Sequence, residues 1–201
     1  MISTDVSTAH DGMLYATLQH LRATAASGVI VALTSANSGE GVTHSVTTLI
    51  NTLSRDGNTR ILRLSSRHLN EISCAPSDIA HHCQQIDANL YEFVGGTDPA
   101  VEKTEGRSWS GDWEFRRDCI EQLRSAFDYV LIDCPALNSA GDVLSLASLV
   151  NGIILIVEAD KTRVDQIEHA EKSLEFARGK LIGHILNKRT YNIPSWLYKR
   201  L

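Results

Sequence analysis

Short apolar runs separated by helix-length stretches constrain what this chain can fold into more than any other feature of the sequence. The runs lie at residues 29–33, 60–64, 90–94, 129–133, 153–157 and 181–186. A strand that is apolar at almost every residue suits a sheet with both faces covered. The stretches with helical spacing lie at residues 13–26, 43–55, 112–126, 142–150 and 162–177. This alternation predicts right-handed crossovers and an α/β fold in three layers, with a doubly wound, mainly parallel sheet.

Two segments do not follow this alternation. Residues 95–111 are polar and rich in glycine, and we expect them to form a long surface loop. Residues 1–12 have neither the basic start nor the apolar core of a signal peptide, and we expect them to be flexible. A length of 201 residues suits one sizeable α/β domain better than two, so residues 1–201 are predicted to form a single domain.

Charge and composition exclude several classes of function. The formal net charge is -5, so broad electrostatic binding of nucleic acid is not expected. No apolar run approaches the roughly 20 residues of a membrane-spanning helix. The 4 cysteines form no CxxC pair and are too irregular for a disulfide framework. These features predict a cytoplasmic protein that is not secreted, does not span a membrane and does not coat nucleic acid.

The first apolar run leads into a glycine-containing turn and then into a predicted helix. The turn reads TSANSGEGVTHS and spans residues 34–45. Its backbone N–H groups and the positive end of the helix dipole would form an anion site. In the phosphate-loop pattern GxxxxGK followed by Ser or Thr, Gly41 and Thr43 fit. Val42 stands where the lysine belongs, and Ala36 takes the first glycine position. The candidate nucleotide-binding residues of this segment are Ser38, Gly39, Glu40, Gly41, Val42, Thr43 and His44.

This segment resembles the phosphate loop of the bacterial tyrosine kinases of capsule and exopolysaccharide synthesis, which typically reads TSxxPGEGKST. Those kinases are deviant phosphate-loop ATPases related to MinD, so the resemblance implies a MinD-like phosphate-loop NTPase fold. The stretch AFDYVLIDCP at residues 126–135 is similar to the family's FDYVIIDTPP. The stretch YNIPSWLYKR at residues 191–200 is similar to the family's YYIPRWLYRR, and the resemblance as a whole covers residues 13–201.

The resemblance also implies roles for individual residues. Asp133 matches the Walker B acid, and the Thr43 hydroxyl and the Asp133 carboxylate would be the ligands of Mg²⁺ bound with ATP or ADP. Asn187 matches a residue that contacts the nucleotide base in the family. A strand-end asparagine that caps a turn is an equally good interpretation of Asn187, and the sequence leaves both open.

The departures from the family pattern affect the residues that the chemistry needs. Val42 replaces the lysine that contacts the phosphates, and Ser65 and Arg67 stand where the second strand of the family ends in two aspartates. Phosphoryl transfer depends almost entirely on positioning and charge stabilisation. Loss of one charge-assisted hydrogen bond of about 1.5–3 kcal/mol weakens phosphate binding by roughly 10–100-fold. We therefore assign no catalytic residue and expect weak or absent nucleotide binding.

The leading functional hypothesis is a pseudokinase-like cytoplasmic adaptor in the synthesis or export of an exopolysaccharide or capsule. The family works with a membrane polysaccharide co-polymerase, so the resemblance implies this or another polysaccharide-synthesis protein as partner, at the inner face of the membrane. A homo-oligomer is also compatible with the family. One alternative is an active ATP-dependent tyrosine autokinase that takes a lysine and acids from a neighbouring subunit, and another is a regulatory ATPase like MinD or ParA. Whether the tail tyrosines Tyr191 and Tyr198 are phosphorylated stays open.

One cluster of potential metal ligands lies in the middle of the chain. Its members are Cys74, His81, His82 and Cys83. Tetrahedral zinc sites usually show paired short spacings, which this cluster lacks. A polar helix with incidental histidines is therefore favoured over a zinc site.

Several charged side chains near the predicted strand ends have two interpretations. Arg63 and Arg67 lie where ligands bind in doubly wound folds, but exposed arginines without a ligand are favoured. Glu40 is expected to face the phosphate site with no lysine beside it. His44 is expected to be neutral, because the helix dipole disfavours a cation in the first turn. The tail at residues 193–201 is expected to pack back on the domain rather than to contact a membrane or a partner.

Overall fold

The protein is built around one seven-stranded sheet among the residues that the computed structural model describes, which are 6–69, 72, 76–94, 109 and 112–189. The strands are β1 (Val29–Ser35), β2 (Ile61–Ser65), β3 (Cys83–Gln85), β4 (Leu90–Phe93), β5 (Tyr129–Asp133), β6 (Gly152–Glu158) and β7 (Leu181–Asn187). Their order across the sheet is β3-β4-β2-β5-β1-β6-β7. Every neighbouring pair is parallel except β3 with β4 at one edge.

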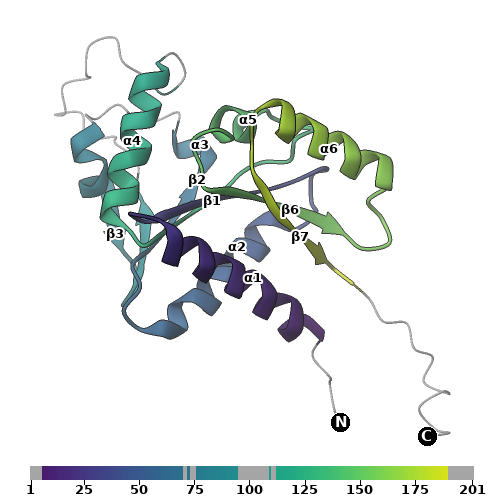
Figure 1. Ribbon diagram of the computed structural model, residues 1–201, viewed down its shortest axis with the longest axis horizontal. Helices are drawn as coiled ribbons and strands as arrows, with labels where there is room; N and C mark the ends of the chain where they lie inside the picture. The colour runs from purple at the N-terminus through teal and green to yellow at the C-terminus, as the bar shows by residue number, and fades with distance from the viewer. Residues whose placement is uncertain (1–5, 70–71, 73–75, 95–108, 110–111, 190–201) are drawn as a thin grey trace, which may run out of the picture.

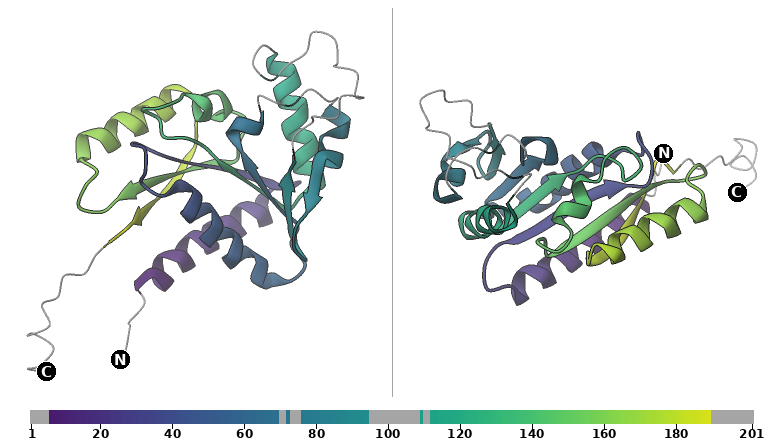
Figure 2. Two further views of the ribbon diagram at one scale, coloured as in Figure 1. Left: turned by 180° about the vertical axis from the view of Figure 1, so that it is seen from behind. Right: turned by 90° about the horizontal axis from the view of Figure 1, so that it is seen from above.

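Helices cover both faces of this sheet (Figures 1 and 2). The α-helices are α1 (Val6–Thr24), α2 (Val42–Leu53), α3 (Ser66–Leu69), α4 (Trp113–Ala126), α5 (Asp142–Leu146) and α6 (Val164–Phe176), and the 3-10 helices are η1 (Ser54–Asp56) and η2 (Pro76–His82). One apolar cluster joins α1 and α2 to one face of the sheet, and another joins α4, α5 and α6 to the other face. The expected three-layer, doubly wound α/β fold is therefore confirmed.

The central strand β1 shows why the strands are apolar at nearly every residue. Its seven residues are all buried. Val29, Val31 and Leu33 point into the cluster with α1 and α2. Ile30 and Ala32 point into the cluster with α4. Because successive side chains of a strand point to opposite faces, a strand covered on both faces has no position left for an exposed polar residue.

Three boundaries differ from the expectations. The helix expected from residue 13 begins at Val6, so part of the segment expected to be flexible is helical. Residues 76–82 form the 3-10 helix η2, in agreement with the expected polar helix, and the strand β3, which was not expected, follows it. The helix expected at 142–150 ends at Leu146. The sequence CQQ of β3 has no alternating pattern, and it forms a strand because β4 offers it a free edge to pair with.

Trp109 is the one described residue inside the segment expected to be a surface loop. Its side chain is 3% exposed and lies in the apolar cluster with α4. The expectation of a surface loop is therefore wrong at this residue, because the ring finds apolar contacts on that face of the sheet. Among the described residues, no helix has both the length and the apolar character needed to cross a membrane.

Candidate functional site

The turn between β1 and α2 has the backbone shape of a phosphate loop. Gly39 and Gly41 have φ angles of 85° and 98°, in the left-handed region that favours glycine. Gly41 precedes the first residue of α2, and no side chain caps this helix end. A Cβ at Gly41 would lie 2.1 Å from Nδ2 of Asn187, so a larger residue there would have to displace the Asn187 amide. The free N–H groups of the first turn therefore have the arrangement that binds anions at helix N-termini.

Val42 occupies the position where the resemblance places a lysine. Its side chain is half-buried and packs against the apolar cluster that joins α1 and α2 to the sheet. The next residue, Thr43, is exposed, as is His44. The start of α2 thus offers a hydroxyl and an imidazole toward solvent, but no lysine ammonium from position 42.

The two expected magnesium ligands are brought together. Asp133 ends β5, where it lies opposite Leu33 of β1 and Ser65 of β2. The Thr43 hydroxyl donates a hydrogen bond of 2.7 Å to Oδ2 of Asp133. A hydroxyl and a carboxylate at this separation are oxygen ligands of the kind that Mg²⁺ prefers.

The end of β2 carries no acid. Ser65 is half-buried beside Asp133, and Arg67 is exposed on the short helix α3. Ser66 between them is 2% exposed, and its hydroxyl donates a hydrogen bond of 3.0 Å to Oδ2 of Asp142 on α5. Asp142 is thus a second carboxylate near the site that the motif analysis did not assign. Its signal was weak, because the acid lies nine residues after Asp133 and only the fold brings α5 to the end of β2.

Cys134 follows Asp133 in the chain and is buried. Burial raises the pKa of the Cys134 thiol, and the charges of Asp133 and Asp142 raise it further. A thiol held protonated in this way is a poor nucleophile and a poor metal ligand. This agrees with its interpretation from sequence as a small core residue.

Glu40 does not face the phosphate site, so the expectation for its side chain is wrong. The residue is 2% exposed. Its carboxylate accepts hydrogen bonds from the backbone N–H of Ala36 at 3.1 Å and from Nδ2 of Asn37 at 2.9 Å. It also accepts one from the Thr162 hydroxyl at 2.5 Å. These three donors hold the carboxylate inside the protein.

Asn187 and Lys188 reach the loop from the end of β7. Nδ2 of Asn187 donates to the carbonyl oxygen of Glu40 at 2.8 Å, and its Oδ1 accepts from the backbone N–H of Lys188 at 2.9 Å. These contacts tie Asn187 to the loop, and the two interpretations of its side chain, turn cap and base contact, both stay predictions. Nζ of Lys188 donates to the carbonyl oxygen of Gly39 at 2.5 Å and lies 3.2 Å from a carboxylate oxygen of Glu158. Lys188 was given no role from the sequence; its backbone is left-handed, at φ 56°.

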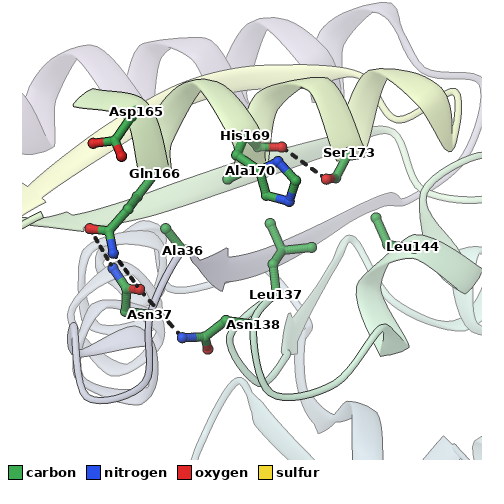
Figure 3. Close-up of a pocket in the computed structure, with 10 residues that line it drawn as sticks. All are labelled: Ala36, Asn37, Leu137, Asn138, Leu144, Asp165, Gln166, His169, Ala170 and Ser173. Atoms are coloured by element: carbon green, nitrogen blue, oxygen red, sulfur yellow. Dashed lines mark hydrogen bonds between the residues drawn. The ribbon is translucent and has the colours of Figure 1, made fainter. Parts of the chain in front are cut away.

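The other side of the loop is tied to the turn after β5 and to α6. Asn37 exchanges two hydrogen bonds, of 3.3 and 3.2 Å, with the amide of Gln166 and accepts a third from Asn138 (Figure 3). The Ser38 and Ser139 hydroxyls are 2.6 Å apart. A cavity of about 600 Å³ lies between these elements. Its lining residues are Ala36, Asn37, Leu137, Asn138, Leu144, Asp165, Gln166, His169, Ala170 and Ser173.

The cluster of potential zinc ligands does not assemble in the described part of the chain. His81 and His82 end η2, and Sγ of Cys83 lies 3.5 Å from the carbonyl oxygen of Ile79. Cys74 lies outside the described residues. Among the residues that are described, no group of three or more His, Cys, Asp or Glu side chains is placed to hold a metal ion.

Arg63 pairs with a carboxylate on the neighbouring strand. Its Nε lies 3.0 Å from Oε1 of Glu92, and both side chains are partly exposed. Whether Arg63 or Arg67 binds an anion stays a prediction. The tail at residues 193–201, with Tyr198, and Tyr191 before it lie outside the described residues.

No family model matches the chain. Tyrosine-protein kinase CpsD of Streptococcus agalactiae is 30% identical over 77 residues, which are 38% of this chain and 34% of the relative. The match thus spans about a third of that relative's length. Tyrosine-protein kinase CpsD of Streptococcus pneumoniae serotype 4 is 27% identical over 190 residues, 83% of this chain and 79% of the relative. Succinoglycan biosynthesis transport protein ExoP of Rhizobium meliloti is 37% identical over 73 residues, 36% of this chain and 9% of the relative.

Solved structures share the fold. The chimerical protein CapA2B2 superposes with a TM-score of 0.68 at 14% identity, covering 94% of this chain and 87% of that chain. The kinase domain of the Escherichia coli tyrosine kinase ETK gives 0.61 at 18% identity, with 88% and 75% covered. The MinD cell division protein of Aquifex aeolicus gives 0.55 at 17% identity, with 86% and 73% covered. These likenesses confirm a MinD-like phosphate-loop fold, and the curated relatives confirm the resemblance to bacterial tyrosine kinases.

Proposed function

We propose that this relative of the bacterial tyrosine kinases is a catalytically inactive adaptor, a pseudokinase that binds ATP or ADP with Mg²⁺ weakly or not at all. The observation that carries the proposal is the place of Val42. Its half-buried side chain packs against the apolar cluster that joins α1 and α2 to the sheet, where the family pattern has a lysine for the phosphates. An aliphatic side chain stabilises neither the phosphates of a bound nucleotide nor the charge that develops during transfer.

The residues at the site fit a magnesium nucleotide only in part. Thr43 and Asp133 supply a hydroxyl and a carboxylate in contact, and the backbone of the loop supplies N–H groups. Against this, Val42 supplies no cation, and Ser65 and Arg67 supply no acid at the end of β2. These residues suit weak binding of a nucleotide and not its turnover, so we assign no transfer step to them.

The names of the relatives support a role in polysaccharide synthesis or export. One is a succinoglycan biosynthesis transport protein, and several are tyrosine-protein kinases. We propose that the protein acts in the cytoplasm and reaches the inner face of the membrane through a partner, a polysaccharide co-polymerase or another polysaccharide-synthesis protein. Assembly into a homo-oligomer is a further part of the proposal.

Incubation of the purified protein with Mg-ATP, followed by intact-mass analysis, tests the absence of catalysis. We expect no phosphorylated species. Calorimetric titration with ADP and ATP, with and without Mg²⁺, then measures how much binding remains. A product phosphorylated on tyrosine would overturn the pseudokinase proposal.

A second candidate is an active tyrosine autokinase completed by a neighbouring subunit. The observation that favours it is the intact contact between Thr43 and Asp133, because an abandoned metal site has no need to keep both ligands. This candidate predicts phosphorylation whose specific rate rises with protein concentration. The regulatory ATPase related to MinD also needs the lysine that position 42 lacks, and the MinD likeness supports the fold alone.

A further inference from the structure

Glu40 is a charged residue enclosed within the protein, and it closes a small ring of the phosphate loop. One carboxylate oxygen accepts from the backbone N–H of Ala36, four residues earlier, and the other accepts from the side-chain amide of Asn37. The ring fixes the first half of the loop, residues 36–40, before the chain enters Gly41. A buried carboxylate is costly unless hydrogen-bond donors surround it, so these contacts have to be kept together.

Thr162 ties this ring to the turn between β6 and α6. Its hydroxyl oxygen accepts a hydrogen bond of 3.1 Å from the backbone N–H of Glu158. The hydroxyl hydrogen is then free to point at Glu40, whose Oε1 lies 2.5 Å away. Residues 122 positions apart in the sequence are thereby joined through one oxygen–oxygen contact.

The chemistry of the three donors selects a carboxylate. An ionised carboxylate only accepts hydrogen bonds, whereas a glutamine would turn an NH₂ group toward one of the donors. Among the described residues, no Lys or Arg forms an ion pair with Glu40; Lys161 and Lys188 both pair with Glu158 instead. The charge of Glu40 is therefore held by hydrogen bonds from the loop and from Thr162.

The backbone of the same segment is held from β7. Asn187 donates to the carbonyl of Glu40, and Lys188 donates to the carbonyl of Gly39. The side chain of Glu40 and the backbone around it are thus fixed by two neighbouring strand ends, β6 and β7. No contact in this set needs a phosphate in the loop.

We propose that Glu40 and Thr162 form a brace that sets the shape of the phosphate loop in the absence of a ligand. In this role both are positioning residues: the brace acts on the backbone of residues 36–41 and does not touch the anion site. The loop keeps its left-handed glycines and its helix N-terminus in place through contacts within the chain. The inference goes beyond the proposed function, since a braced loop is compatible with either an inactive adaptor or an active kinase.

Hydrogen exchange on the full-length protein without nucleotide tests the brace. Thr162→Val removes the hydroxyl and leaves the side-chain volume nearly unchanged. Glu40→Gln replaces one carboxylate oxygen, which accepts hydrogen bonds, with an NH₂ group, which donates them. We expect amides of residues 36–45 to exchange roughly tenfold faster in both variants, because each leaves a buried polar group unpaired. Peptides from α4 and β4 should exchange as in the wild type. Thr162→Ser keeps the hydroxyl and should restore the wild-type rate in the loop.

Thr47→Val is the matched control, because Thr47 is exposed on α2 and its hydroxyl bonds only the carbonyl of Thr43. The double variant of Glu40 and Thr162 should exchange no faster in the loop than Glu40→Gln alone, because the two residues act as one unit. The proposal would be overturned if the exchange rate of the loop amides were unchanged in Thr162→Val, or if exchange became faster to the same extent in every peptide. If Glu40→Gln does not fold, the comparison of Thr162→Val with Thr162→Ser decides. Because no nucleotide is added, the result is independent of whether the protein binds one.

Discussion

The site has two sides, the phosphate loop with its supporting strand ends and the end of β2, and they differ in their polar contacts and in which family residues are absent. On the loop side, the buried carboxylate of Glu40 is hydrogen-bonded to Thr162, and Asn187 and Lys188 donate to the backbone carbonyls of Glu40 and Gly39. The β2 side ends in Ser65, Ser66 and the exposed Arg67. The shape of a phosphate loop and the charges of phosphoryl transfer are therefore separable: this chain retains the first and lacks most of the second. Four predictions test that contrast.

The largest effect is expected from Gly41→Ala on the loop side. Gly41 combines a φ of 98° with a Cβ position 2.1 Å from Nδ2 of Asn187. A left-handed backbone costs an alanine about 1–2 kcal/mol, and displacing the Asn187 amide adds the loss of its hydrogen bond, for a total of about 2–4 kcal/mol. Urea denaturation measures the loss in unfolding free energy.

Gly57→Ala is the matched control for this prediction. Gly57 also has a positive φ, of 68°, but nothing lies within 4 Å of its Cβ position. It should cost only about 1 kcal/mol. Equal losses in the two variants would show that the contact with Asn187 contributes nothing to stability.

Val42→Lys tests whether adding the missing charge to the existing loop strengthens nucleotide binding without creating catalysis. A lysine at this position should tighten ADP binding by roughly 10–100-fold, since the loop that would use it is already formed. We expect no phosphorylated product, because the end of β2 still lacks its acids. Calorimetry and intact-mass analysis measure the two outcomes. Thr47→Lys adds the same charge to an exposed position of α2 and should leave the affinity nearly unchanged. Phosphorylation in Val42→Lys would mean that the β2 side is not needed.

Ser66→Ala tests the polar contact that the β2 side still has. The hydroxyl is buried and donates to Asp142, so its removal should lower the free energy of unfolding by about 1 kcal/mol. Ser145→Ala removes an exposed hydroxyl that bonds only the backbone carbonyl of Asp142, and it should change stability by less than about 0.5 kcal/mol. A larger loss in Ser145→Ala would mean that the contact between Ser66 and Asp142 does not organise this side.

The smallest effect is expected from pH, through Glu158 on the loop side. The hydrogen bond from Lys161 holds the pKa of Glu158 below its ordinary value of 4.5; burial opposes this, and Lys188 adds to the lowering. A lowered carboxyl pKa contributes stability that is fully present above pH 4.5 and is lost as the pH falls through the folded-state value. The amide signal of Gly39 should therefore shift in NMR spectra only below about pH 4.5, where Lys188 loses its anionic partner. In Glu158→Gln the shift should be absent, and a shift centred near neutral pH would contradict this assignment.

The contrast between the two sides also shows which contacts of the site a sequence motif can predict. The pairing of Thr43 with Asp133 was predictable, because a phosphate loop and the end of a neighbouring parallel strand meet at the same edge of the sheet. The direction of Glu40 was not, because its position in the motif says only that it lies in the loop. One of the three donors that hold its carboxylate, Thr162, lies 122 residues away. Asp142 and Lys188 were given no role from the sequence for the same reason.

The sequence by itself determined the class of fold, since runs of apolar residues at strand length can be buried only in a sheet covered on both faces. It also determined which charges are absent, because Val42, Ser65 and Arg67 cannot supply a lysine or two acids in any fold. Only the tertiary structure decided where the remaining polar groups point. Side-chain direction in the loop depends on hydrogen-bond partners in the turn after β6 and on α6, and long-range contacts of this kind leave no periodic signal in the chain.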